Sequence, residues 1–306
     1  MLMNDDAVRY LVAHADDDEA STSDYWREHK PLFRINEDGT FEGNSVLGNV
    51  GGKRSFFYTF MHRIFQLPMK RLARQYRNLK DCEKIGRTVA RRRHQQFTYD
   101  SLRHVFTLAL IRHHREDVLR SSTSLIIGDG FGMMASLLLE CHPSNRVLVV
   151  NLTKSLALDL AYLQRAFPEA QTALVVDRDS MQAALENPEI RIIAVQADNA
   201  HLLVQAPIQL AVNIVSMQEM DLPVIRGYFD VLRQNPSTST LFYCCNRRFK
   251  TSNFEEYPWR DGDGILEEGV CEWSQQYYSS KPPFMHKREY GKRVVMHRLV
   301  EMEKLS

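Results

Sequence analysis

The chain has 306 residues, of which 44% are hydrophobic, and this is enough apolar surface for one large globular domain with an extension. Its longest apolar runs are far shorter than the ~20 residues that cross a bilayer, which excludes a transmembrane helix. The five cysteines form no CxxC pair and no histidine stands at zinc-ligand spacing, so the sequence indicates no metal site. The N-terminus is acidic where a secretory signal would be basic, and we therefore expect a cytoplasmic protein.

The overall charge of +1 hides an uneven distribution. Residues 1–52 contain 11 acidic and 4 basic residues, a net of −7, whereas residues 53–120 contain 17 basic and 5 acidic residues, a net of +12. Several of these basic residues recur every three or four positions, which places them on one helical face. Such a face is typical of a surface for anionic partners, namely sugar nucleotides, lipid-linked sugars, phosphates or RNA. A solvated helix and a salt-bridged contact in a homo-oligomer are the alternatives.

The predicted elements divide the chain near residue 118. Residues 1–118 are charged and helical, and we interpret them as an N-terminal cap with helices over 57–79, 80–95 and 98–118. In residues 119–306 strands and helices alternate. Strands are expected at 124–128, 146–151, 172–176, 191–196, 209–215, 240–245 and 292–300, and helices at 132–141, 155–166, 179–186 and 222–233. This alternation predicts an α/β fold with a mostly parallel, doubly wound sheet.

The first predicted strand ends in a glycine-rich loop that leads into a helix, Gly128-Asp129-Gly130-Phe131-Gly132. Alternate glycines allow positive φ angles and close approach of a ligand, so the loop is typical of nucleotide-cofactor sites. All three glycines fit the S-adenosylmethionine pattern ExGxGxG, with Ile126 at the position of the acid. The dinucleotide pattern GxGxxG fits from Gly130 through Gly132 to Ala135. A tight turn without a ligand is the third alternative.

Polar side chains follow two further strands. Asn151 stands about twenty residues past the loop, where an acid usually binds the ribose hydroxyls, and its amide can also hydrogen-bond them. Asp198 follows a later strand and is expected to accept a hydrogen bond from the adenine amine, a turn aspartate being the alternative. Because ligands bind outside the carboxyl ends of parallel strands, we expect both residues at the cofactor site.

The second half of the chain carries four further motifs, Ser216-Met217-Gln218-Glu219-Met220, Tyr228-Phe229, Cys245-Asn246-Arg247 and Tyr257-Pro258-Trp259. With a weaker similarity at Tyr25-Trp26, they resemble the bacterial sugar O-methyltransferases that depend on S-adenosylmethionine. The resemblance spans roughly residues 120–260. It implies a Rossmann-like class I methyltransferase fold and methyl transfer to the hydroxyl of a sugar or sugar nucleotide. It also implies cofactor contacts at Leu152, Asn213 and Ser216.

Glu219 is our first candidate for the catalytic group. A sugar hydroxyl is a weak acid, so Glu219 would serve as a general base, or as a ligand to a divalent metal that bridges vicinal hydroxyls. A carboxylate that caps or pairs near the next helix is the alternative. His201 is a weaker catalytic candidate, with a structural histidine as its alternative.

Five residues are expected to contact the acceptor. Gln218, Asn246 and Arg247 would bind its hydroxyl, carboxylate or phosphate groups. Tyr257 and Trp259 would stack on the apolar face of a sugar, with core packing as the alternative.

Three other functions stay open. An RNA methyltransferase is motivated by the +12 segment, although no NPPY-like tetrad follows the strand at 209–215. A catalytically silent relative is motivated by two departures from the pattern of the family, Ile126 in the loop and Asn151 after the second strand. An NAD-dependent oxidoreductase is motivated by the alternative glycine register.

Overall fold

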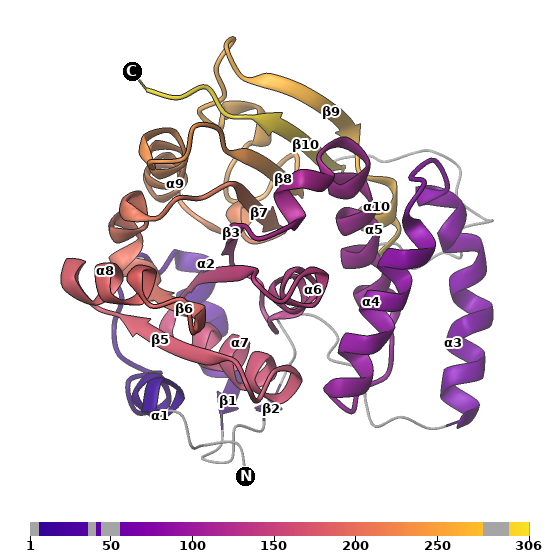
Figure 1. Ribbon diagram of the computed structural model, residues 1–306, viewed down its shortest axis with the longest axis horizontal. Coiled ribbons are helices and arrows are strands. Elements are labelled where there is room, and N and C mark those ends of the chain that lie inside the picture. Colours follow the sequence, from indigo (N-terminus) through magenta and orange to yellow (C-terminus); the bar gives the residue numbers. More distant parts are fainter. Residues whose placement is uncertain (1–5, 36–40, 44–55, 278–293, 306) are drawn as a thin grey trace.

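The computed structural model describes residues 6–35, 41–43, 56–277 and 294–305 (Figure 1). Its centre is an eight-stranded sheet in the order β5-β6-β4-β3-β7-β8-β10-β9. The strands are β3 (Thr123–Ile127), β4 (Arg146–Asn151), β5 (Gln171–Val175), β6 (Ile190–Gln196), β7 (Leu210–Ile214), β8 (Leu241–Arg247), β9 (Gly264–Val270) and β10 (Val295–Glu301). Strands β3 to β8 pair in parallel, and β10 is antiparallel to both of its neighbours.

Helices cover both faces of this sheet (Figure 1). One face packs against α4 (Leu79–Arg92), α5 (Tyr99–His114), α6 (Met133–Cys141) and α7 (Thr153–Ala166), and the other against α8 (Arg178–Glu186) and α9 (Leu222–Gln234). Successive residues of a strand point to opposite faces of the sheet. Ile126 and Val149 are buried in the core under the first of these faces, and Leu125 and Leu148 in the core under the second. This architecture confirms the expected α/β fold class with a mostly parallel, doubly wound sheet.

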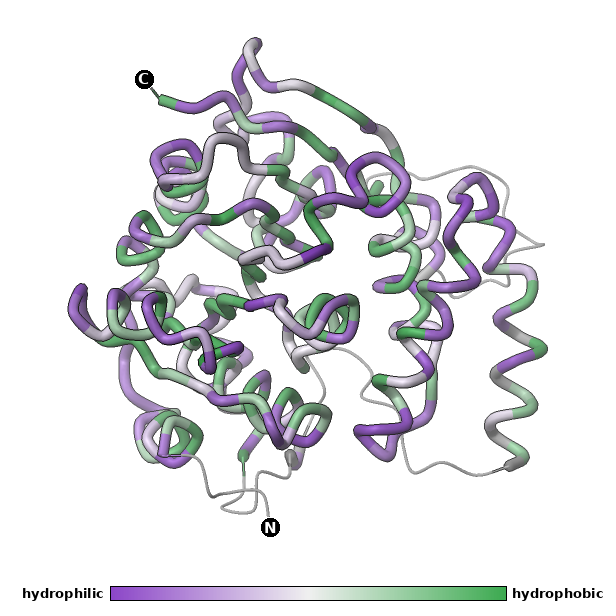
Figure 2. The backbone as a smooth tube through the Cα atoms, in the orientation of Figure 1, coloured by the Kyte–Doolittle hydropathy of each residue, from purple (hydrophilic) through white to green (hydrophobic). Residues whose placement is uncertain are grey.

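The N-terminal region builds on the same core. Helix α1 (Asp6–Ala13), α4 and α5 contribute buried residues to the cluster that covers the first face of the sheet. Helix α5 has ten consecutive buried residues, and α6 is hydrophobic nearly all round (Figure 2). Within the described part of the chain, no helix has both the length and the apolar character needed to cross a membrane.

One expected helix differs from the observed elements, and one observed strand was not expected. The helix expected over 57–79 is divided, because α3 (Phe56–Met69) contains Pro68 near its end and a 3₁₀ turn, η2 (Lys70–Ala73), follows. Strand β9 was not predicted, since Glu267 and Glu268 interrupt any alternation of apolar and polar residues. The strand lies at the edge of the sheet and is mostly exposed, which explains the weak pattern.

Candidate functional site

The order of the strands reverses between β3 and β7. In open α/β sheets ligands bind at such a reversal, in the crevice outside the carboxyl ends of the strands. Gly128 follows β3 and Ser216 lies just after β7. A side chain at Gly128 would overlap the hydroxyl of Ser216, so only glycine fits there.

The three loop glycines all adopt positive φ, at 70° for Gly128, 86° for Gly130 and 59° for Gly132. A Cβ atom on Gly132 would lie 2.9 Å from the carbonyl oxygen of Asp159 and 2.9 Å from Leu163 Cγ, so this glycine permits close packing of α6 on α7. Two of the glycines are thus required by packing. Gly130 is the position whose backbone conformation suits close approach of a ligand.

Asp129 caps helix α6. Its two carboxylate oxygens accept hydrogen bonds from the backbone N–H groups of Met134, at 2.9 Å, and Ala135, at 2.8 Å. Burial raises the pKa of Asp129, and these hydrogen bonds and the nearby Arg93 oppose the rise. In this arrangement the carboxylate is committed to the helix, so the contact with a cofactor expected for Asp129 would have to come from its backbone.

Arg93 brings a buried cation to the glycine loop. It follows α4, is 3% exposed and donates a hydrogen bond to the carbonyl oxygen of Phe131. Its guanidinium lies 4.9 Å from the centroid of the Tyr162 ring. Burial lowers the pKa of Arg93 to about 10, although Asp129 acts in the opposite direction. Sequence reasoning did not identify this residue, because it is one of three consecutive arginines in the basic segment.

Asp159 supplies a carboxylate next to the position where the sequence has Asn151 instead of an acid. The amide of Asn151 donates to Asp159 at 2.9 Å, and the N–H group of Gly132 donates to the same carboxylate at 2.9 Å. Burial, followed by the charge of Asp129, raises the pKa of Asp159 well above its ordinary value. The other atom of the Asn151 amide, its oxygen, accepts from Leu152 N at 3.0 Å. Asn151 is therefore a link between β4, α7 and the loop.

The N-terminal segment 14–35 lies across the carboxyl ends of β4 and β6. Asp198 accepts hydrogen bonds from Ala20 N at 2.9 Å and Ser21 N at 2.7 Å, and Glu19 accepts from Thr153 N at 2.9 Å. Burial acts to raise the pKa of Asp198, but the hydrogen bonds from the segment outweigh it and the pKa is lowered. Asp198 thus holds the N-terminal segment here, which is a different role from the expected contact with adenine.

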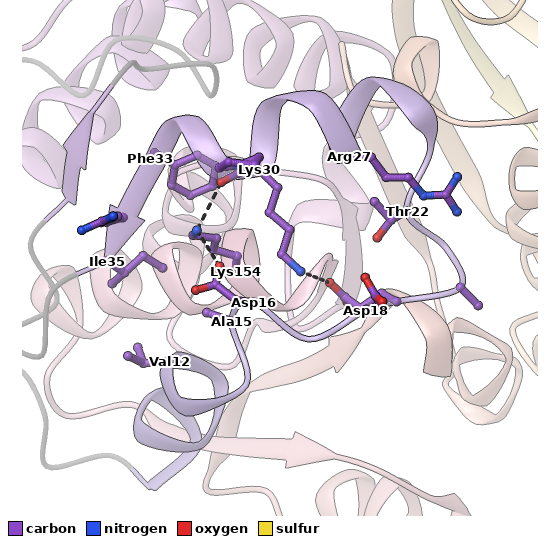
Figure 3. A pocket seen from close by; sticks show the side chains of 14 residues that line it. Val12, Ala15, Asp16, Asp18, Thr22, Arg27, Lys30, Phe33, Ile35 and Lys154 are labelled. Atoms are coloured by element: carbon purple, nitrogen blue, oxygen red, sulfur yellow. Dashed lines mark hydrogen bonds and ion pairs between the residues drawn. The ribbon is translucent and has the colours of Figure 1, made fainter.

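A pocket of about 920 Å³ lies beneath this segment (Figure 3). Lys154, from the first turn of α7, points into it and bonds Asp16 at 2.9 Å and the carbonyl oxygen of Lys30 at 3.2 Å. The ammonium of Lys154 also lies 4.9 Å from the centroid of the Phe33 ring. The polar lining carries both signs of charge, so the pocket favours no single charge type of ligand.

A network of buried amides fastens the ends of β3, β7 and β8 together. Asn213 and Ser216 both donate to the carbonyl oxygen of Ile127, at 2.9 Å and 2.8 Å. Asn246 donates to Asn213 Oδ1 at 2.8 Å and accepts from Gln218 N at 3.0 Å. These groups are satisfied within the protein, so they position the site and leave little capacity for an acceptor.

Val215 adopts φ 68° directly after β7. This conformation is unusual for a β-branched residue and costs of order 1–3 kcal/mol. It redirects the chain into η5 (Met217–Glu219), which carries Glu219 to the crevice. The strained residue therefore lies two residues before η5, the turn that contains the candidate catalytic residue Glu219.

Glu219 forms an ion pair with Lys250, with Nζ and Oε1 2.6 Å apart and side chains 13% and 20% exposed. The Lys250 ammonium also lies 3.7 Å from the centroid of the Tyr25 ring. Burial raises the pKa of Glu219, and Lys250 opposes the rise; burial followed by the charge of Glu219 raises the pKa of Tyr25 to about 12. Three distant segments thus bring a carboxylate, an ammonium and a phenol together.

The remaining predicted residues lie in different surroundings. Arg247 is half-buried at the end of β8, and its charge lowers the pKa of Glu219. His201 is exposed on η4 (Ala197–Gln205). Tyr257 is 3% exposed and packs its ring against Phe254, and the Trp259 indole donates to the carbonyl oxygen of Phe254 at 3.1 Å. Tyr257 lies within the core cluster of the second face, and Trp259 is partly buried against it.

The described residues contain no group of three or more His, Cys, Asp or Glu side chains placed to hold a metal ion. Glu219 is bonded to Lys250 instead of to a further acidic or imidazole group. The cation bound to the Glu219 carboxylate in the structure is therefore the Lys250 ammonium.

Comparison of the chain with protein-family models finds no match, and comparison with curated proteins finds none either. Among solved structures it is similar to geranyl diphosphate C-methyltransferase from Streptomyces coelicolor A3(2), with 10% identity over 59% of this chain and 69% of that chain and a TM-score of 0.39. It is also similar to phosphoethanolamine N-methyltransferase 2 of Haemonchus contortus, with 11% identity, coverage of 65% and 52%, and a TM-score of 0.39. Similarities of this size do not assign the chain to a family.

Proposed function

We propose that the protein is an S-adenosylmethionine-dependent methyltransferase whose cofactor binds in the crevice between β3 and β7. The observation that carries the proposal is the pairing of Gly130, at φ 86°, with the buried guanidinium of Arg93 beside the same loop. The carboxylate of an amino-acid moiety suits the guanidinium of Arg93. When bound, this cofactor supplies an electrophilic methyl group on a sulfonium centre.

Asp129 favours this cofactor over a dinucleotide. A dinucleotide places its pyrophosphate on the free N–H groups at a helix N-terminus. In this chain the Asp129 carboxylate takes the N–H groups of Met134 and Ala135 at the start of α6, and its charge would repel a diphosphate. A zwitterionic amino-acid moiety does not carry that penalty, so the loop fits S-adenosylmethionine better than NAD.

Glu219 is the proposed general base. Glu219 would accept the hydroxyl proton as the acceptor oxygen takes the methyl group, and the bond between that carbon and the sulfur of the bound cofactor would break to leave S-adenosylhomocysteine. Lys250, 2.6 Å away, opposes the effect of burial and favours the ionised carboxylate that this step needs. Tyr25, with its pKa raised to about 12, stays protonated and can donate a hydrogen bond. Most of the remaining barrier is addressed by alignment of the reacting groups.

The acceptor we propose is the hydroxyl of a sugar that carries an anionic group, such as a sugar nucleotide. Arg247 beside Glu219 supports this choice, because a half-buried guanidinium at a strand end suits a phosphate or carboxylate. The test is formation of S-adenosylhomocysteine from S-adenosylmethionine with a panel of sugars and sugar nucleotides. We expect Glu219→Gln to lower kcat about 10²–10⁴-fold. Turnover that is unchanged in this variant would remove Glu219 from the mechanism.

A second candidate is a cofactor-binding subunit without methyl transfer. It is favoured by the hydrogen bonds that Asp198 accepts from the backbone of Ala20 and Ser21. These bonds occupy the carboxylate that was expected to contact adenine. Binding of S-adenosylhomocysteine without turnover of any acceptor in the panel would support this candidate, and turnover would exclude it.

A further inference from the structure

A second pocket, of about 510 Å³, lies between helices α3 and α4. Its lining contains four cationic side chains and no acidic residue: Arg63, Lys84, Arg87 and Arg91. It also contains the hydroxyl groups of Thr59 and Thr88 and, on its apolar side, Phe97. The net charge of the lining is therefore strongly positive, unlike that of the pocket beneath the N-terminal segment, whose lining carries both signs.

The cations converge from two helices. Lys84, Arg87 and Arg91 are spaced by three and four residues on α4 and so share one face, and Arg63 comes from α3. Like charges at these spacings repel each other by a few tenths of a kcal/mol per pair. Lys84 pairs with Asp81 and Arg87 pairs with Glu83, whereas Arg63 and Arg91 have no carboxylate partner among the residues that the structure describes, so the repulsion is compensated only in part.

Neighbouring groups hold two of these side chains in place. The guanidinium of Arg87 lies 4.6 Å from the centroid of the Phe97 ring and bonds Glu83 at 2.6 Å. Arg91 donates to the hydroxyl of Thr88 at 2.9 Å. Because these contacts restrict the long side chains before any ligand arrives, less entropy is lost when an anion binds.

We propose that this pocket binds the phosphate or diphosphate group of a phosphorylated ligand. Arginine presents paired N–H donors that match two oxygens of a phosphate, and a diphosphate can offset several of the four charges. The size of the pocket is within the range of small-molecule sites, and its concave form suits a compact anion better than the extended backbone of RNA. The site is separate from the proposed cofactor crevice and does not depend on it.

The test is calorimetric titration of the full-length protein with pyrophosphate at low ionic strength. The double variant Arg63→Gln/Arg91→Gln is expected to lower the affinity at least tenfold. The matched control, Arg71→Gln/Arg74→Gln, removes two exposed charges of the same basic segment outside the pocket, and we expect it to stay within twofold of wild type. Equal losses in both double variants, or no binding to wild type, would overturn the proposal. RNA binding without pyrophosphate binding would also overturn it.

Two further arms separate the sources of the phosphate. Binding to phosphatidylglycerol vesicles that pyrophosphate displaces would assign the pocket to a lipid phosphate, and pyrophosphate binding without vesicle binding would assign it to a water-soluble ligand. Titration of Arg63→Gln/Arg91→Gln with S-adenosylhomocysteine distinguishes this proposal from the function proposed above. We expect this variant to match wild type in that titration, whatever the wild-type affinity is.

Discussion

Asp159 is a fully buried carboxylate that is bonded to an amide, Asn151, and to the backbone of Gly132. Its pKa in the folded protein is raised well above 3.8, mainly by burial, so the folded state retains a proton that the unfolded state releases. The free energy of unfolding is therefore greatest below the unfolded pKa and falls as the pH rises toward the folded pKa.

We expect Asp159→Asn to remove this pH dependence, which amounts to about 1.4 kcal/mol per pH unit within that window. Urea unfolding of wild type and variant from pH 5 to pH 8 measures the two slopes. The slope is the readout because the substitution also changes hydrogen bonds at every pH. Parallel slopes in the two proteins would show that Asp159 is not protonated in the folded state.

The Glu219–Lys250 pair predicts a shift in the pH dependence of the proposed reaction. Lys250 lowers the pKa of Glu219 against the effect of burial, so its removal raises that pKa further. We expect Lys250→Met to move the acid limb of kcat/KM to higher pH, since the base must be ionised. Arg248→Met is the matched control, because Arg248 is exposed and pairs with Glu255. An acid limb that does not move would exclude Glu219 as the titrating base.

The glycine loop could be predicted from the sequence, because positive φ at alternate positions leaves a local pattern of glycines. The roles of Arg93, Asp159 and Lys250 could not be predicted. Each residue reaches the site from a helix or loop, and the local sequence there indicates only a charged segment. From the sequence alone, Asn151 is predicted to replace the acid that binds the ribose hydroxyls. The carboxylate beside it comes from α7, eight residues later in the chain, and only the packing of that helix brings the two together.

At the scale of elements, close packing of α4 on α5 depends on Gly86. A Cβ atom there would lie 2.5 Å from Val105 Cγ2 and 2.9 Å from Phe97 Cε2. Gly227 of α9 differs, since a Cβ atom there meets nothing within 4 Å.

We expect Gly86→Ala to lower the free energy of unfolding by about 1–3 kcal/mol through overpacking. Its matched control, Gly227→Ala, should raise the free energy of unfolding by about 0.5–1 kcal/mol through helix propensity. Denaturant unfolding of the two variants measures whether each substitution lowers or raises the free energy of unfolding. A stabilised Gly86→Ala variant would mean that α4 and α5 are not in close contact.

Most strands of the sheet were predictable because they are buried on both faces and read as short apolar runs between turn residues. The observed β4, Arg146–Asn151, has the bounds expected from the sequence, β6 differs by one residue at one end, and β3, β5 and β7 differ by one residue at each end. The boundary of α3 and the edge strand β9 were not predictable. Pro68 is tolerated inside the last turn of α3, and the exposed β9 gains its order from β10.

At the scale of the whole molecule, the N-terminal segment 14–35 is joined to the sheet by contacts that span more than a hundred residues. Glu19 bonds Thr153, Asp16 bonds Lys154, and Asp198 accepts from Ala20 and Ser21. The segment covers one end of the proposed cofactor crevice and also supplies Tyr25 to the pair of Glu219 and Lys250. In the proposed function this segment is therefore part of the site as well as a cap on the fold.

We expect Asp198→Ala to release this segment. Loss of two hydrogen bonds to a carboxylate favours local opening by about 1.4 kcal/mol or more, which corresponds to about tenfold faster cleavage by trypsin at the exposed Arg27. Asp179→Ala, in the exposed first turn of α8, is the control and should leave the rate unchanged. Equal cleavage rates in all three proteins would show that Asp198 does not hold the segment.

The central claim is that the crevice between β3 and β7 binds S-adenosylmethionine, and that the Asp129 carboxylate disfavours binding of a dinucleotide there. Parallel calorimetric titration of the full chain with S-adenosylhomocysteine and NAD tests it most directly. The account predicts micromolar binding of S-adenosylhomocysteine and no measurable binding of NAD. Tighter binding of NAD, or binding of neither compound, would contradict it.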